Sequence, residues 1–383
     1  MRQAKIGKET FVFLILFLLL CWYMASIMGL AHMFGSVMQT SFSLLKDTVF
    51  FIMSITVLAG ALSALFSEFG VITLLQKIIT PIMRPLFGLP GVASLGAITA
   101  FLSDNPAILA LAKDRRIRGY FKKYEIAALT NIGTGFGMGL IVFTYMAGLG
   151  FASASAIGVA GAIIGSLIST RLMLIFTKKH YIKTGQWEEQ NQYDDTLEVK
   201  NEAGEVVIEE EEKRNYFDRF MNAMLDGGKN GVEMGVSIIP GVLCVCTFVM
   251  MMTFGPGPDG YGGKAYEGIA ILPVIGQYIS PVTDVLFGFK DPTDIAFPIT
   301  ALGAVGAALG TLPQMLAKNL VGPNEIAVFT GIGMCWSGYL STHISMMDAL
   351  GKRELVSFAL IAHTIGGLCA GVAAHYLFIL IGG

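Results

Sequence analysis

The sequence predicts an all-α polytopic membrane protein built from two inverted repeats. Of its 383 residues, 54% are hydrophobic and 14% are charged, and the mean hydropathy is +0.65. Soluble domains carry about 25% charged residues, so a soluble protein is excluded. Apolar runs long enough to span a bilayer recur along the chain, and the two halves fall into register at a shift of 200 residues. No phosphate-binding glycine loop, zinc-ligand spacing or nucleophile elbow occurs, so an enzyme is not expected.

The chain begins with three basic residues, Arg2, Lys5 and Lys8, and an apolar run follows from Phe11 to about Leu30. A signal peptide begins in the same way, but its apolar core has only about 7–15 residues. This run is long enough to cross the membrane. We therefore expect an uncleaved first helix with a cytoplasmic N-terminus, by the positive-inside rule. The first domain is predicted at residues 1–47, as this helix and an external loop.

The first repeat is predicted at residues 48–177. A span from about Thr48 to Phe66 precedes Val71–Phe87, where two prolines and two basic residues favour an amphipathic helix at the membrane interface. Gly91–Lys113 is apolar but has Ser-Asp-Asn-Pro at its centre. Proline disfavours helix at the residue before it, and an acid is costly inside a bilayer, so we expect a re-entrant hairpin with a polar tip. A basic run at 113–123 indicates that both ends of the hairpin are cytoplasmic.

Two more spans, Glu125–Leu149 and Ala154–Phe176, complete this repeat. In the first span four glycines stand at every second position, and each weakens a helix by about 1 kcal/mol relative to alanine. Close packing between helices explains these glycines. An unwound polar segment containing Asn131 and Thr134 explains them equally well.

Residues 178–230 form a hydrophilic insert, which is predicted to be cytoplasmic. Thr196–Glu210 is compatible with a small β-hairpin around an Asn-Glu-Ala-Gly turn, and Tyr216–Leu225 has the pattern of an amphipathic helix. The insert is either a linker between the repeats or a surface that binds a cytoplasmic partner. The sequence does not decide between these two interpretations.

The second repeat is predicted at residues 231–383 because identities occur in the same order in both halves. The residues that meet an identical residue at the shift of 200 include Pro81, Leu86, Phe87, Gly88, Glu125, Ile126, Ala127, Thr130, Ile132, Gly133, Leu140 and Met146. Its elements are expected at Gly231–Phe254, Ala270–Phe289, Asp294–Lys318, Glu325–Leu350 and Leu355–Leu380. Such ordered matches at one constant shift are not expected by chance.

Each repeat is expected to cross the membrane three times, because its hairpin enters and leaves on one side. An odd number of crossings reverses the orientation, so the second repeat must be inverted and the C-terminus external. The basic residues agree, since the region after the second hairpin carries only Lys318. Inverted repeats with broken helices are the architecture of many secondary transporters.

These hairpins and broken helices resemble a known arrangement. Both halves are similar to the nucleoside-recognition, or Gate, domain, and the order of their elements resembles the transport core of concentrative nucleoside transporters. The resemblance covers residues 48–177 and 231–381. In that family a Gln-Thr-Glu-Ala-Pro run at the first hairpin tip holds the nucleobase, and the resemblance puts Ser103, Asp104 and Asn105 in that place.

The resemblance implies further substrate contacts in the second half, from the interruption of its hairpin and from its broken helix. These are Thr311, Gln314, Trp336, Ser337, Tyr339, Ser341, Thr342 and His343. A site for the coupling ion, H⁺ or Na⁺, is implied at Asp104, Asn131, Gly133 and Thr134. No resident metal and no other cofactor are expected. Only the first hairpin is expected to supply a charge to the site. The second hairpin is expected to contribute mostly to the shape of the site.

Each of these residues also has a structural explanation. Asp104 and Asn105 are good caps for a helix N-terminus, although an ionisable residue within a membrane segment indicates function by default. His343 is interpreted as a donor to a hydroxyl, as a titrating group or as a packed core residue. Trp336 and Tyr339 either stack on a base or fill the core, as aromatic residues more often do.

The sequence therefore predicts a secondary transporter in the bacterial inner membrane. It would move a small polar solute, a nucleoside or a related molecule, by alternating access with H⁺ or Na⁺ coupling. A homo-oligomer in the lipid bilayer is expected, and no nucleic-acid partner. The alternatives are a non-transporting scaffold or sensor, as in spore maturation proteins that share the Gate domain, and a metal-ion permease. For the permease, Cys335 is a lone soft ligand and weak evidence.

Overall fold

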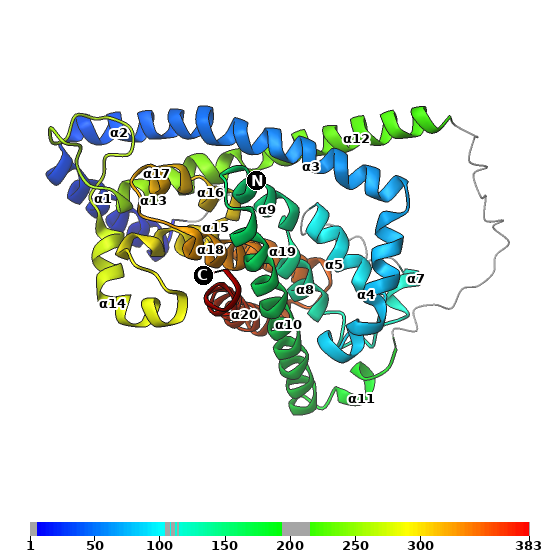
Figure 1. Ribbon diagram of the computed structural model, residues 1–383. Helices are drawn as coiled ribbons and strands as arrows, with labels where there is room; N and C mark the ends of the chain where they lie inside the picture. The colour runs from blue at the N-terminus through cyan, green and yellow to red at the C-terminus, as the bar shows by residue number, and fades with distance from the viewer. Residues whose placement is uncertain (1–5, 104–107, 109–111, 113–114, 194–214, 383) are drawn as a thin grey trace.

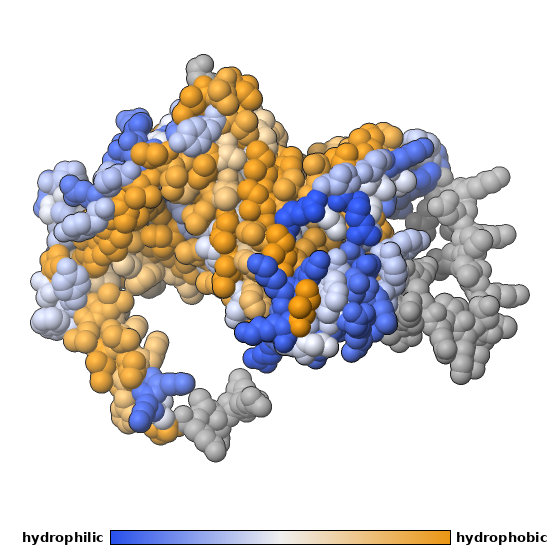
Figure 2. Space-filling model, turned by 90° about the horizontal axis from the view of Figure 1, so that it is seen from below, coloured by the Kyte–Doolittle hydropathy of each residue, from blue (hydrophilic) through white to orange (hydrophobic). Residues whose placement is uncertain are grey.

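The computed structural model describes residues 6–103, 108, 112, 115–193 and 215–382, and helices make up almost all of this part of the chain (Figure 1). Six of the described helices are long and apolar enough to cross a membrane. The predicted all-α, multi-pass membrane fold is therefore confirmed. Most of the face in Figure 2 is hydrophobic, and hydrophilic residues gather over the end of α10 (Ala152–Lys183) and around α11 (Trp187–Gln190).

Two long helical segments pack side by side along one edge of the molecule (Figure 1). The first joins α2 (Leu30–Ser43), the π-helical turn η1 (Leu44–Val49) and α3 (Phe50–Glu68). The second joins α12 (Tyr216–Ser237), the π-helical turn η2 (Gly241–Cys246) and α13 (Thr247–Thr253). Each half thus begins with a long helix that has one π-helical interruption.

Glycines let α3 and α12 approach closely. A Cβ at Gly227 would lie 2.4 Å from the carbonyl oxygen of Gly60, and one at Gly231 would lie 2.2 Å from that of Thr56. The Thr56 hydroxyl donates to the Gly231 carbonyl at 2.7 Å. Small residues every four positions are the usual way for membrane helices to associate.

The external loop expected after the first helix is absent, because residues 30–49 are helical. Helix α1 (Lys8–Met28) turns at Gly29, which has a φ of +80°, and α2 begins at once. The polar side of α2 is buried against the loop before α14. There the Thr40 hydroxyl accepts the backbone N–H of Tyr266 at 2.8 Å, and the Ser43 hydroxyl lies 3.0 Å from the Tyr266 hydroxyl. This loop, distant in sequence, gives Thr40 and Ser43 of α2 a partner that a local pattern does not reveal.

The two interfacial helices have the same length and the same ends. Helix α4 is Val71–Phe87, as predicted, and α14 is Ile271–Phe287, exactly one shift of 200 away. Each ends at a glycine in the left-handed region, Gly88 with φ +78° and Gly288 with φ +68°. This conformation suits glycine, which has no Cβ to clash.

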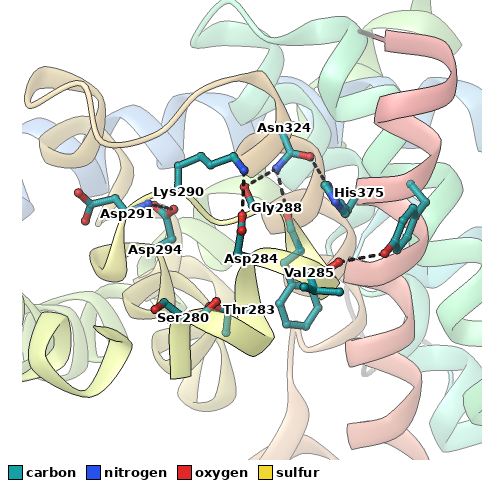
Figure 3. A network of polar contacts seen from close by, with 12 residues as sticks. Ser280, Thr283, Asp284, Val285, Gly288, Lys290, Asp291, Asp294, Asn324 and His375 are labelled. Carbon is teal, nitrogen blue, oxygen red and sulfur yellow. Dashed lines mark hydrogen bonds and ion pairs between the residues drawn. The ribbon is translucent and has the colours of Figure 1, made fainter. Parts of the chain in front are cut away.

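The end of each interfacial helix is tied to the last long helix of its half. In the first half, Arg171 of α10 donates to the carbonyl oxygens of Leu86 and Pro85. In the second half, Asn324 donates to the Phe287 carbonyl at 3.0 Å and accepts from His375 of α20 (Val356–Leu377) at 2.7 Å (Figure 3). Different residues make equivalent connections.

The second hairpin is formed by helices within one short stretch of chain. The 3₁₀ turn η3 (Pro292–Ile295) leads into α15 (Ala296–Gly303), and the chain breaks at Ala304 with extended backbone. Helices α16 (Val305–Leu309) and α17 (Leu312–Ala317) then return. In the first hairpin, α5 (Ala93–Leu102) is described, but most of the tip and second arm lies outside the described residues.

A broken helix follows each hairpin. In the first half α8 (Ala128–Phe136) and α9 (Gly139–Gly148) are separated by Gly137 and Met138. The glycine tract is therefore interrupted there, but Asn131 and Thr134 lie within α8, so the expectation of an unwound segment that contains them is wrong. In the second half α18 (Pro323–Cys335) and α19 (Tyr339–Ala349) are separated by residues 336–338. The long helices α10 and α20 pack across both of them, with a Cβ at Gly165 only 2.4 Å from the Gly366 carbonyl oxygen.

Two further contacts recur at the shift of 200. The buried Glu125 carboxylate accepts the backbone N–H of Lys122 at 3.0 Å, and the buried Glu325 carboxylate accepts that of Gly322 at 2.9 Å. The Glu325 bond belongs to the capping box at the start of α18, and the Glu125 bond closes the turn that precedes α8. The correspondence supports the repeat, while the opposite orientation of the two halves stays a prediction.

Replacing Gly231 by alanine is expected to lower the stability of the protein by about 1–3 kcal/mol, as overpacking does. Its Cβ would meet backbone of α3, which cannot yield. Gly228→Ala is the matched control on the same helix, because its Cβ would lie 3.6 Å from a Val57 methyl group, an ordinary contact. Thermal unfolding in detergent measures both, and equal melting temperatures for the two variants would contradict the close packing of α3 and α12.

Candidate functional site

The candidate site lies where the two broken helices meet α10 and α20. Met138 takes a left-handed conformation with φ 55° between α8 and α9, and Trp336 ends α18. A helix that stops inside a membrane protein leaves carbonyl and N–H groups without helical partners. Polar side chains from neighbouring helices supply such partners here, so the breaks concentrate polar groups at one place.

A chain of hydrogen bonds joins four helices at this place. Asn131 of α8 donates to the Ser169 hydroxyl at 2.9 Å and to the Ala359 carbonyl at 3.1 Å. The Ser169 hydroxyl of α10 lies 3.0 Å from Nδ1 of His363 on α20. Nε2 of His363 contacts the carbonyl oxygen of Cys335, at the end of α18. Since a carbonyl can only accept, His363 carries its hydrogen on Nε2 and accepts from Ser169 on Nδ1.

His343 of α19 is the one member of this cluster with an unused polar atom. Its side chain is fully buried, and its ring centroid lies 4.5 Å from that of His363. Nε2 lies 3.5 Å from the Thr134 hydroxyl, but Nδ1 has no hydrogen-bond partner among the described residues. Buried polar atoms are nearly always paired, so the unpaired Nδ1 is a candidate contact for a bound molecule.

Aromatic side chains form one wall of the cluster. The rings of Trp336 and Tyr339 are stacked with centroids 5.7 Å apart, and Tyr339 lies 5.8 Å from His363. The indole N–H of Trp336 donates to the His363 carbonyl at 3.3 Å, and the Tyr339 hydroxyl donates to the Leu360 carbonyl at 3.2 Å. Both side chains are buried, so in this conformation they pack within the protein.

Both hairpins press against the broken helices at equivalent glycines. A Cβ at Gly133 would lie 2.7 Å from Cγ2 of Ile108, in the second arm of the first hairpin. One at Gly333 would lie 3.1 Å from Cγ2 of Val305, in the second arm of the second hairpin. The absence of a side chain at Gly133 therefore lets the first hairpin pack closely against α8.

Several predicted site residues come together here. Asn131, Thr134, Trp336, Ser337, Tyr339 and His343 all take part in the cluster, where the Ser337 hydroxyl donates to the Thr134 carbonyl at 3.4 Å. Thr342 is half-buried in the first turn of α19. The roles of all these residues in binding stay predictions.

Other predicted residues lie elsewhere or outside the description. Ser103 caps the end of α5, and its hydroxyl donates to the Thr99 carbonyl at 2.8 Å. Thr311 donates to the Ala308 carbonyl at 2.7 Å within its own turn, and Gln314 lies on α17. Asp104, Asn105 and the side chain of Ser341 are outside the described residues.

Ser169 and His363 are not among the site residues predicted from the sequence. Ser169 stands in an apolar span with nothing to distinguish it from other small residues. His363 stands in an apolar stretch of α20, and a histidine in such a position could have indicated a buried polar contact. Cys335, the lone soft ligand considered for a metal, is fully buried near the Ala162 carbonyl, at 3.6 Å. Within the described ranges no three His, Cys, Asp or Glu residues gather in a way that could hold a metal ion.

Comparison with known proteins agrees with this arrangement. Residues 49–170 match the family model described as nucleoside recognition, Gate. An uncharacterized protein of Alkalihalophilus pseudofirmus is 30% identical over 86 residues, which are 22% of this chain and 18% of that protein. The chain therefore matches less than a fifth of that relative's length.

Solved structures of the transporter CNTnw share the fold. A double variant in an outward-facing state gives a TM-score of 0.55 at 15% identity, covering 88% of this chain and 80% of that chain. CNTnw in an inward-facing, substrate-bound state gives 0.53 with the same identity and coverage. The resemblance inferred from the sequence is thus confirmed, and the chain shares the fold of these structures.

Replacing Ser169 by alanine is expected to destabilise the protein by about 1–3 kcal/mol, because Asn131 and His363 both lose a buried partner. Ser166→Ala, one turn earlier on α10, is the matched control. Its buried hydroxyl has no hydrogen-bond partner in the described part of the chain, so its loss is expected to change stability little. Thermal unfolding compares the two, and a Ser169→Ala protein as stable as Ser166→Ala would argue against the hydrogen-bond chain.

Proposed function

We propose that this protein is a secondary transporter that moves a nucleoside or a related small polar solute across the bacterial inner membrane. The observation that carries the proposal is the buried polar cluster at the two broken helices, with Nδ1 of His343 left unpaired. A structural protein has no need for two helix breaks at one place. A transporter uses such breaks to present polar groups to a solute within the membrane.

The chemistry of the cluster favours a neutral, planar solute. Its described side chains are amide, hydroxyl, imidazole and aromatic groups, and none carries a fixed charge. Such groups can pair with the hydroxyls and ring edges of a nucleoside, and the aromatic wall offers a face for stacking. The Gate domain matched at residues 49–170 carries the same expectation, since it is described by nucleoside recognition.

Alternating access would arise from movement of the hairpins against the interfacial helices α4 and α14. The contacts at Gly133 and Gly333 link each hairpin to its broken helix, so hairpin and site would move together. We propose a cytoplasmic N-terminus, from the distribution of basic residues, and an external C-terminus, from the odd number of crossings expected in each repeat. We propose H⁺ or Na⁺ as the coupling ion, with Asp104 at the first hairpin tip as the charged group, and a homo-oligomer as the assembly.

His343→Asn is expected to reduce uptake of the transported solute by about tenfold or more, since a lost hydrogen bond to a ligand is worth about 1.4 kcal/mol. Proteoliposomes supplied with labelled nucleosides and bases measure this uptake. His32→Asn is the control, because His32 is exposed on α2. Asp104→Ala is tested in the same assay for its part in coupling. Uptake equal to that of the natural protein for every solute would refute the role given to either residue.

The alternative of a scaffold is favoured by the way the insert begins. Its first residues dock on the loop after the first hairpin: the Lys122 ammonium donates to the Asn191 amide oxygen at 3.0 Å, and the Tyr124 N–H donates to the Gln190 carbonyl at 3.1 Å. Lys352, before α20, donates to the Gln190 side chain at 3.0 Å. The insert is thus attached to both halves and would report their movement to a partner.

Deleting residues 195–213 separates the two functions. For a transporter, uptake is expected to survive, because the docked residues 186–193 stay in place. For a scaffold, the natural protein itself shows no uptake, and the deletion variant no longer binds a cytoplasmic partner. Uptake in proteoliposomes and pull-down from cell extracts are measured on the same preparations.

A further inference from the structure

The joint between α14 and the second hairpin contains a buried acid that lies outside the candidate site and is only partly used by the capping box of η3. The chain bends by 81° between Ile271–Phe287 and Pro292–Gly303. Asp294 lies in η3 at this joint, and its side chain has no exposed surface (Figure 3). The joint is closely packed, since a Cβ at Gly276 of α14 would lie 2.0 Å from the carbonyl oxygen of Pro292.

Only one oxygen of Asp294 is paired. Oδ2 accepts the backbone N–H of Asp291 at 3.2 Å, while the Asp291 carboxylate accepts the N–H of Thr293 at 2.8 Å. Oδ1 of Asp294 has no hydrogen-bond partner in the described ranges. An ionised carboxylate seeks partners for both oxygens, so this environment does not suit the charged form.

The charges around the joint do not compensate Asp294 either. The nearby basic residue, Lys290, forms an ion pair with Asp284 of α14 at 2.8 Å. His375 of α20 is bonded to Asn324. The other facing groups are acids, Asp291 on η3 itself and Glu325 on α18. A buried charge without a partner is very unfavourable, and a carboxyl group in that position keeps its proton instead.

The first half shows that the fold does not require an acid here. At the shift of 200, Ser94 takes the place of Asp294 and Thr80 that of Ser280. The fully buried Ser94 hydroxyl donates to the Gly91 carbonyl at 2.7 Å and lies 3.2 Å from the Thr80 hydroxyl. A neutral serine therefore closes the same joint with all its polar atoms paired. Asp294 thus adds an ionisable group at the start of the second hairpin. The expectation that only the first hairpin supplies a charge stays a prediction.

We propose that Asp294 is a proton-binding site, with its carboxyl group protonated while the joint between α14 and the second hairpin is closed. When the joint opens, the carboxyl O–H bond breaks, the proton passes to water, and a hydrated carboxylate remains. Protonation of Asp294 does not depend on the proposed transport function. Its use to couple proton movement to solute movement does rest on that function.

Infrared spectroscopy of the purified full-length protein tests the protonation directly. The spectrum at neutral pH is expected to contain the C=O stretch of a protonated carboxyl group that is absent from Asp294→Asn and from Asp294→Ser. The serine variant places at position 294 the residue type that Ser94 provides at the equivalent joint of the first half, so it is expected to fold. A difference spectrum that instead shows an ionised carboxylate in the natural protein at neutral pH overturns the proposal.

The pH dependence of stability provides a second, independent test. The folded state holds this proton more tightly than the unfolded chain, whose aspartates titrate near pH 3.9. The natural protein is therefore expected to lose stability relative to Asp294→Asn as the pH rises from about 4 toward 9. Thermal unfolding of both proteins across this range measures the difference. Parallel profiles overturn the proposal.

A sodium-replacement control identifies the bound ion. The measurements also test the protonation of Asp294 independently of transport. Spectra and melting curves are repeated with choline in place of Na⁺; a carboxylate that is ionised and stabilised only by Na⁺ would show a sodium site instead and overturn the proton assignment. None of these measurements uses a transported solute. Absence of uptake would therefore refute the proposed function while leaving the protonation of Asp294 intact, and the reverse also holds.

Discussion

Backbone hydrogen bonding within the bilayer is the constraint on which this structure depends. Lipid offers no partner to a free carbonyl or N–H, so a helix can break at membrane depth only where protein surrounds the break. The carbonyl of Cys335, at the end of α18, is bonded by His363, and that of Thr134 by Ser337. The polar cluster thus exists to complete two broken helices, and the same requirement concentrates in one place the groups that a solute could use.

The two halves meet this constraint with the same backbone and different side chains. Glu125 and Glu325 each accept the backbone N–H of the residue three positions earlier, just before α8 and at the start of α18. The ends of the interfacial helices are held by an arginine in one half and by an asparagine and a histidine in the other. Glycines that end the interfacial helices are the same residue type in both halves, whereas the residues that donate hydrogen bonds to the helix ends differ between the halves. At another position that differs, the change from Ser94 to Asp294 introduces an ionisable group.

Charged side chains lie mostly near the surface, and the described cluster at the broken helices is neutral. Most described ion pairs lie at exposed or half-exposed positions, such as Lys290 with Asp284 and Arg219 with Glu68. The described cluster at the broken helices is neutral, because an unpaired charge there would be unfavourable. The joint at Asp294 lies apart from this cluster, in η3.

The sequence by itself determined what depends on local and repeating pattern. The membrane class follows from composition, the limits of α4 from its proline-rich amphipathic pattern, and the second half from the constant shift. The tertiary structure decided what depends on partners distant in the chain. Thr40, in the helical segment 30–49, has its hydrogen-bond partner in a loop more than 200 positions away, and Ser169 and His363 become one network only when α10 and α20 pack together. Burial of Asp294 against α14 likewise requires the folded joint, since hydrogen-bond partners and desolvation are properties of the packed chain and not of the local sequence.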